Sequence, residues 1–158
     1  MNRDPLLTEI ETVFPEVPMP VGLDLSFHKD DCGHCTYLRQ DLEEFRGKPI
    51  TGETIRVLHQ EMTSLSAAGW RWALPHYLKY CLSNEGRYTQ TETEFLIYNL
   101  GLELKFQREA LQRFGGLNTA QIQCLVHFLE WCSDDPHWSD YCAEDVERAL
   151  NFMRTINA

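Results

Sequence analysis

The chain has 158 residues and carries a net charge of -10 at neutral pH, with a sequence pI near 5.0. Hydrophobic residues make up 43% of it, which is enough to build a packed core and excludes disorder of the whole chain. Phosphate backbones and anionic lipids repel so acidic a chain, so we expect neither a nucleic acid nor a membrane surface as its partner; a basic protein is favoured instead. At this length we expect a single domain over residues 1–158.

The first predicted element is a helix over residues 4–14. Asp4 can cap this helix, and Pro5 occupies the first helical position, where its missing N–H costs nothing. The prolines of residues 15–20 then predict an extended segment, because proline cannot continue a helix. The N-terminus lacks the apolar run of a signal peptide, and no stretch reaches the roughly 18 apolar residues that a membrane span needs. We therefore expect a cytoplasmic protein, in which thiols stay reduced.

The segment over residues 27–38, FHKDDCGHCTYL, contains a candidate metal site. His28, Cys32 and Cys35 form the pattern H-x3-C-x2-C. The C-x2-C spacing lets two thiolates bind one ion in a tight turn, and histidine is the other common ligand of zinc. Structural zinc sites use four ligands, so this pattern is one ligand short. Candidates for the fourth are His34, Asp31, Cys81 and Cys142.

The same two cysteines support two other interpretations. A C-x-x-C motif before a helix can have a thiol of lowered pKa and take part in redox chemistry, because the helix dipole favours the thiolate. Such motifs normally lie in a βαβ unit, and none is predicted here. Free cysteines can also act as small buried hydrophobic residues. The zinc site, the redox site and plain structural thiols all stay open at this point.

Apolar residues at helical spacing predict helices along the rest of the chain. Ser66 and Asn118 are candidate N-caps, and Thr91 with Glu94 forms a capping-box pattern. Pro75 is expected to interrupt and kink one helix, since proline removes a backbone donor and clashes with the preceding turn. The predicted helices cover residues 36–47, 51–65, 66–74, 76–83, 91–102, 103–116, 118–132 and 141–156, and residues 83–90 and 133–140 are predicted loops.

The chain shows no alternating apolar pattern of strands and no hairpin signal. We therefore predict an all-α fold, a compact bundle of about seven helices with the extended proline-rich segment near its N-terminus. The familiar catalytic signatures are also missing, namely a glycine-rich phosphate loop, a G-x-S-x-G elbow and an H-E-x-x-H pair. We expect no catalytic residues and a protein that is not an enzyme.

Carboxylates are concentrated over residues 134–147, with no lysine or arginine among them and two aromatic residues interleaved. This combination is typical of an anionic surface with aromatic anchors that docks a basic protein. Helix capping is the competing explanation, because acidic residues are also favoured near helix N-termini. The predicted partner-binding residues are Asp134, Asp135, Trp138, Asp140, Tyr141, Glu144, Asp145 and Glu147.

Three blocks of the sequence resemble a family of small bacterial proteins without an assigned biochemical function. They are the H-x3-C-x2-C segment followed by YLRQDLEEFRG, the block LSAAGWRWALPHYLKYCL, and LNTAQIQCLVHFLEW near the C-terminus. Together they span most of the chain. The resemblance implies a helical fold and no catalytic residue.

These observations favour a small, acidic protein-binding module. Its sharpest form is an immunity protein, or antitoxin, whose carboxylates neutralise a basic bacterial toxin. The alternative is a helical domain that binds a structural zinc ion through His28, Cys32 and Cys35. A C-x-x-C thiol redox protein is the less favoured third possibility.

Overall fold

The computed structural model describes residues 3–29 and 32–157, and over these residues the fold is all-helical and has no β-strand. The α-helices are α1 (Arg3–Val13), α2 (Gly33–Glu43), α3 (Gly52–Glu61), α4 (Ala67–Leu82), α5 (Asn84–Thr89), α6 (Thr91–Leu100), α7 (Gln107–Phe114), α8 (Thr119–Asp134), α9 (Pro136–Tyr141) and α10 (Ala143–Ile156). Three 3-10 helices are η1 (Gly22–Asp24), η2 (Met62–Ser64) and η3 (Leu104–Phe106). None of the helices in the described ranges is long and apolar enough to cross a membrane.

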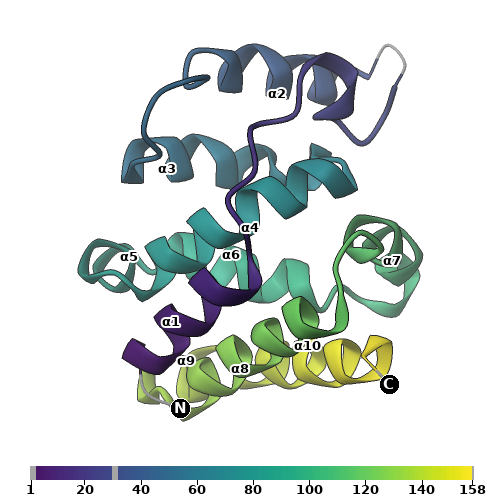
Figure 1. The fold of residues 1–158 in the computed structure, drawn as a ribbon. Coiled ribbons are helices and arrows are strands. Elements are labelled where there is room, and N and C mark those ends of the chain that lie inside the picture. The colour runs from purple at the N-terminus through teal and green to yellow at the C-terminus, as the bar shows by residue number, and fades with distance from the viewer. Residues whose placement is uncertain (1–2, 30–31, 158) are drawn as a thin grey trace.

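The helices are arranged around α4, which crosses the middle of the molecule (Figure 1). Helices α2 and α3 lie at one end, and α8 and α10 lie side by side at the other. Helix α4 is buried along most of its length, and its Trp70 and Tyr77 are among the largest fully buried side chains. Helix α8 packs against both α1 and α10, so the hydrophobic core extends from α4 to this end of the molecule.

The expected number of about seven helices is too low, because the described residues form ten α-helices. Residues 83–90 and 133–140 were expected as loops but contain α5 and α9. The side chains of Ser83 and Asp135 accept hydrogen bonds from backbone N–H groups in the first turns of these two helices. Pro136 occupies the start of α9, where proline is well tolerated. Ser83 and Asp135 lie in polar segments that the sequence indicates as loops, but in the structure they cap short helices.

The predicted interruption at Pro75 is wrong, because α4 continues through this residue as one helix. Proline at this position leaves the carbonyl group of Arg71 without its usual partner, at a cost of about 3 kcal/mol in a helix interior. Pro75 is buried, and α4 packs against α1, α3 and α7. Burial of apolar surface along α4 compensates for the local cost of the proline.

Two of the predicted helix caps are confirmed and two are wrong. Asp4 lies inside α1, which begins at Arg3, and is not its cap. Ser66 Oγ accepts a hydrogen bond of 3.0 Å from the backbone N–H of Gly69. Asn118 Oδ1 accepts one of 2.9 Å from the N–H of Gln121. The capping box expected at Thr91 is not formed, because the N-cap of α6 is Gln90 in a left-handed conformation with φ of 65°.

The proline-rich segment has no helical structure, as predicted, and runs as an extended chain from α1 towards the end that contains α2 (Figure 1). Arg46 holds it in place through hydrogen bonds of 3.0 Å to the carbonyl oxygens of Met19 and Pro20. After η1, a single antiparallel bridge joins Ser26 to Leu65. This bridge brings the Cys/His segment against the chain that follows α3.

Candidate functional site

His28, Cys32 and Cys35 come together as the sequence pattern predicted. Their ligand atoms all lie within 4.8 Å of one another, and Cys35 Sγ is 3.7 Å from His28 Nδ1. A tetrahedral zinc ion with Zn–S bonds of about 2.3 Å and Zn–N bonds of about 2.0 Å would separate these two atoms by about 3.5 Å. The group therefore has the geometry to hold a metal ion.

Two segments of backbone position this group. Cys32 is the N-cap of α2, which places Cys35 in the first turn of the helix. The loop that carries His28 is fixed by a hydrogen bond of 2.7 Å from the N–H of Phe27 to the carbonyl oxygen of Ser64. Arg39 on α2 donates a further hydrogen bond of 2.6 Å to Ser26 Oγ. The loop, α2 and η2 are thus connected around the three ligand side chains.

The described residues add no fourth His, Cys, Asp or Glu atom to this group. His34, Cys81 and Cys142, which were candidates for the fourth ligand, do not join it. Asp31 lies outside the described residues.

The cysteine thiols differ in the direction in which the fold shifts their pKa. The backbone N–H of Cys35 lowers the pKa of the Cys32 thiol by stabilising its thiolate, whereas burial raises the pKa of Cys35. Burial raises the pKa of Cys81 and Cys124 to about 12, and these thiols behave as buried apolar side chains. The βαβ unit that normally surrounds a redox C-x-x-C is missing from residues 3–29 and 32–157, which contain no strand.

The metal-capable group lies at a cavity of about 460 Å³ between α2, the end of α3 and α7. Arg113 on α7 lines this cavity and is almost fully buried. Its guanidinium donates a hydrogen bond of 2.8 Å to the carbonyl oxygen of Thr63 and lies 3.6 Å from the carboxylate of Glu109. Burial lowers the pKa of Arg113, and Glu109 opposes that effect. No sequence pattern pointed to Arg113, because α7 meets this loop only through the tertiary fold.

Glu61, the last residue of α3, lines the same cavity. Burial raises the pKa of Glu61 to about 7, and the neighbouring carboxyl group of Asp41 adds to this increase. Its Oε2 atom is buried and accepts no hydrogen bond from an N–H or hydroxyl group among the described residues, while a side-chain hydrogen bond links Glu61 to the carboxyl group of Asp41. The sequence did not indicate that Glu61 and Asp41 meet, because they lie on the separate helices α3 and α2.

The predicted partner-binding residues lie at the end of α8, on α9 and at the start of α10. They differ in how exposed they are and in whether they already have a partner within the chain. Trp138 is only 4% exposed, which corrects its expected role as a surface anchor. Asp135 caps α9, and Asp145 pairs with Arg148. Tyr141 is 64% exposed and stacks on the ring of His137. Asp134 is exposed near the end of α8.

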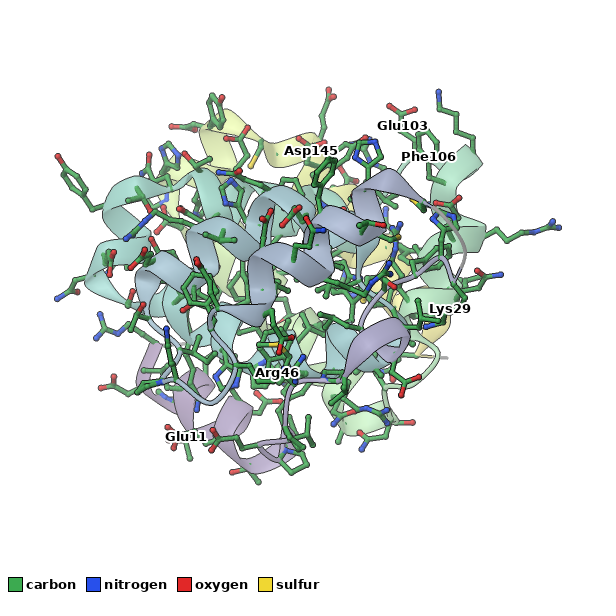
Figure 2. All side chains as sticks on the ribbon, turned by 90° about the horizontal axis from the view of Figure 1, so that it is seen from above. Glu11, Lys29, Arg46, Glu103, Phe106 and Asp145 are labelled. Carbon is green, nitrogen blue, oxygen red and sulfur yellow. The ribbon has the colours of Figure 1, made fainter. Side chains whose placement is uncertain are left out.

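The other three carboxylates of this set, Asp140, Glu144 and Glu147, are exposed and have no ion pair or hydrogen bond within the part of the chain that the structure describes. Asp145, Glu103 and Phe106 lie towards the same side of the molecule (Figure 2). The negative charge on this surface is therefore not fully compensated by neighbouring side chains.

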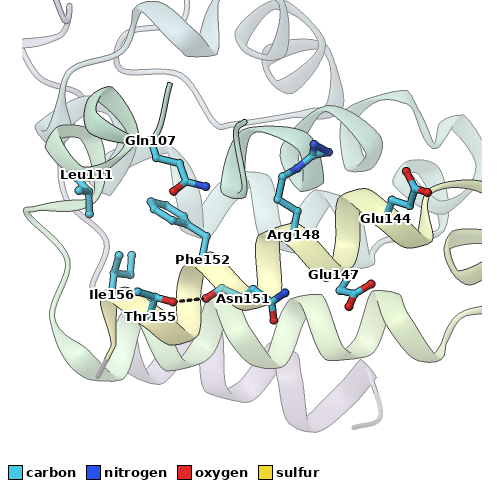
Figure 3. Close-up of a pocket in the computed structure, with 9 residues that line it drawn as sticks. All are labelled: Gln107, Leu111, Glu144, Glu147, Arg148, Asn151, Phe152, Thr155 and Ile156. Atoms are coloured by element: carbon cyan, nitrogen blue, oxygen red, sulfur yellow. Dashed lines mark hydrogen bonds between the residues drawn. The ribbon is translucent and has the colours of Figure 1, made fainter. Parts of the chain in front are cut away.

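A groove of about 610 Å³ lies between α7 and α10, and two of these carboxylates, Glu144 and Glu147, line it (Figure 3). Glu144 and Glu147 lie at one end of it, and Leu111, Phe152 and Ile156 line the other. Leu111 is 49% exposed although it is a large apolar residue. The sequence did not indicate this groove, because it forms where two separate helices meet.

Comparison with known proteins gave one match. The model of a family described as a family of unknown function (DUF6714) matches residues 2–149. Neither the comparison with curated proteins nor that with solved structures gave a match.

Proposed function

We propose that this chain, which belongs to the DUF6714 family of unknown function, is a non-enzymatic module that binds a basic protein on α9 and α10. The proposal is drawn from the surface of the chain itself. The observation that carries the proposal is the pair of exposed carboxylates of Glu144 and Glu147, which have no ion pair among the described residues and line the α7–α10 groove.

The groove supplies both kinds of contact that a protein interface needs. Its apolar end, with Leu111 and Phe152, can bury an aliphatic or aromatic side chain of the partner. Its acidic end attracts lysine and arginine and speeds association. Arg148 also lines the groove, but its charge is compensated by Asp145. A basic partner is therefore favoured over an acidic one.

In its sharpest form the proposal is that the chain is an immunity protein that neutralises a basic bacterial toxin in the cytoplasm. A toxin that acts on an anionic substrate has a basic binding surface, and a row of carboxylates can occupy that surface in place of the substrate. The net charge of -10 supports such an association over the whole molecule.

Charge reversal tests this proposal. The double variant Glu144→Lys/Glu147→Lys should weaken binding to the partner by at least about tenfold, because each substitution replaces an attraction with a repulsion at the interface. The partner is recovered from the native host with the wild-type chain, purified, and titrated against each variant by calorimetry.

The matched control is Glu44→Lys/Glu53→Lys. It makes the same change in net charge at two exposed glutamates, at the end of α2 and in the first turn of α3. We expect this control to bind nearly as tightly as the wild type. Equal affinities for the two double variants, or a captured partner that is acidic, would contradict the proposal.

A structural zinc site is the second candidate, and the 3.7 Å separation of Cys35 Sγ and His28 Nδ1 favours it. We expect purified protein to contain about one zinc ion per chain and Cys32→Ser to lose the metal and melt at a lower temperature, because metal binding is coupled to folding. Elemental analysis and thermal melting measure both. Negligible zinc together with unchanged melting of the variant would remove this candidate.

A further inference from the structure

We infer that Cys32 and Cys35 form a dithiol that hydrogen peroxide oxidises, in which Cys32 is attacked first and Cys35 converts the product into a disulfide bond. The site is the C-x2-C pair at the start of α2, and its reactant is a small hydroperoxide. The inference goes beyond both proposed functions, because it requires neither a protein partner nor a bound zinc ion.

Exposure distinguishes the two thiols of the pair. Cys32 is the N-cap of α2, is partly exposed and lines the cavity of about 460 Å³. Cys35, three residues further along the chain, is fully buried. A molecule as small as hydrogen peroxide can therefore reach the sulfur of Cys32, whereas the protein shields the sulfur of Cys35. Cys32 is thus the thiol that reacts first.

The position of Cys32 also favours the form of the thiol that attacks peroxide. The thiolate is the nucleophile, and the N-terminus of a helix stabilises it. The backbone N–H of Cys35 lowers the pKa of Cys32, whereas burial raises the pKa of Cys35. Both effects agree with the order of reaction that the exposure of the two thiols indicates.

The two sulfur atoms are close enough for a second step. Together with a ring nitrogen of His28, they lie within 4.8 Å of one another. Residues three apart at the start of a helix lie on the same side, and the C-x-x-C spacing is that of known redox-active thiol pairs. Rotation of the partly exposed Cys32 side chain about its own bonds brings the two sulfurs into contact.

The oxidation proceeds in two balanced steps. The Cys32 thiolate attacks one oxygen of hydrogen peroxide, the O–O bond breaks, and the leaving hydroxide takes up the proton that the thiol released and becomes water. Cys32 is then a sulfenic acid. Cys35 Sγ attacks Cys32 Sγ, the S–O bond breaks, and the second hydroxide leaves as water with the Cys35 proton. His28 Nδ1, 3.7 Å from Cys35 Sγ, is placed to carry that proton. The two thiols lose two electrons, and the peroxide is reduced to two molecules of water.

The remaining cysteines lack this combination of exposure and a neighbouring thiol. Each is at most 7% exposed, burial raises the pKa of its thiol, and none joins the described group of Cys32 and Cys35. We therefore expect peroxide to oxidise the C-x2-C pair in preference to the others. These others are Cys81, Cys124, Cys132 and Cys142.

The proposed zinc site uses the same side chains, so the two states exclude each other. A disulfide bond removes two of the three proposed ligands, because zinc binds thiolates. The lack of a βαβ unit among the described residues does not oppose the inference, since an internal disulfide needs no surface for a substrate protein.

The experiment uses the full-length chain after treatment with a chelator, so that its result does not depend on zinc. The protein is exposed to hydrogen peroxide, denatured, alkylated with iodoacetamide, digested with trypsin and analysed by mass spectrometry. Both cysteines of the pair lie in one tryptic peptide, DDCGHCTYLR. We expect this peptide to lose the mass of two hydrogen atoms and to escape alkylation, while the buried cysteines remain alkylated. Dithiothreitol should reverse the change.

Three variants test the separate roles. Cys35→Ser should stop at the sulfenic acid of Cys32, which dimedone traps. Cys32→Ser should leave Cys35 oxidised at least about tenfold more slowly than Cys32. Cys142→Ser is the matched control, because Cys142 is also a helix N-cap but is only 7% exposed. This control should form the disulfide at the wild-type rate.

A measurement on the folded wild type keeps the test independent of any substitution. Iodoacetamide should alkylate Cys32 at least about tenfold faster than Cys35. Equal rates for the two thiols, no disulfide in the peroxide-treated wild type, or equal oxidation of the buried cysteines would each overturn the inference. Zinc content and partner binding are measured on separate samples, so failure of either proposed function leaves this result unchanged.

Discussion

At the scale of single residues, Glu61 shows how burial changes the chemistry of a side chain. In an unfolded chain its pKa is near 4.5, and in the folded chain burial raises it to about 7. Between these two values the folded state binds more protons than the unfolded state, so protonation of Glu61 stabilises the fold. This contribution is fully present below the lower pKa and is lost as the pH rises through about 7.

Glu61→Gln should remove this dependence in the metal-free protein. The stability of the wild type should fall relative to the variant by about 1 kcal/mol between about pH 5 and pH 8, a value reduced from the full shift because the carboxyl group is partly exposed. Urea denaturation of both proteins at a series of pH values measures this difference. Parallel curves over the whole range would show that Glu61 titrates as it does in the unfolded chain.

At the scale of helices, α6 and α10 approach each other closely where α6 ends. Gly101 is the C-cap of α6, and a Cβ atom placed on it would lie 2.3 Å from Cα of Ala149 on α10. The neighbour is backbone, so it cannot move aside as a flexible side chain would. Two small residues therefore set the distance between these two helices.

Gly101→Ala should destabilise the protein by about 1–3 kcal/mol, because the added methyl group forces α6 and α10 apart. The control is Gly33→Ala at the start of α2, where a Cβ atom would meet nothing within 4 Å. Chemical denaturation of both variants in metal-free buffer gives the comparison. A Gly101→Ala protein as stable as the control would show that the two helices can separate without cost.

At the scale of the whole molecule, the metal-ligating and the acidic side chains lie on different helices, although α7 lines both the metal-capable cavity and the α7–α10 groove. The Cys/His group is at the end formed by α2 and α3, whereas the acidic surface is on α9 and α10 (Figure 1). The buried core around α4 and α8 lies between them. Charge reversal at Glu144 therefore leaves the metal-binding side chains in place, and Cys32→Ser leaves the acidic surface in place. The two proposals can fail or succeed separately.

The sequence alone determined the features that depend on short separations along the chain. Apolar residues at helical spacing indicated an all-α fold, and the local caps Ser66 and Asn118 were identified correctly. Cys32 and Cys35 meet because residues three apart at the start of a helix lie on the same side. His28 needs only a short loop to join them.

Only the tertiary structure decided the features that depend on contacts between distant segments. Packing around α4 maintains a helix through Pro75, and burial of Trp138 removes it from the surface predicted to bind a partner. Glu61 reaches the metal-capable cavity because the chain after α3 pairs with the loop before α2. Local patterns report which face of an element is apolar, but not which other element covers it. That choice follows from the packing of the whole core.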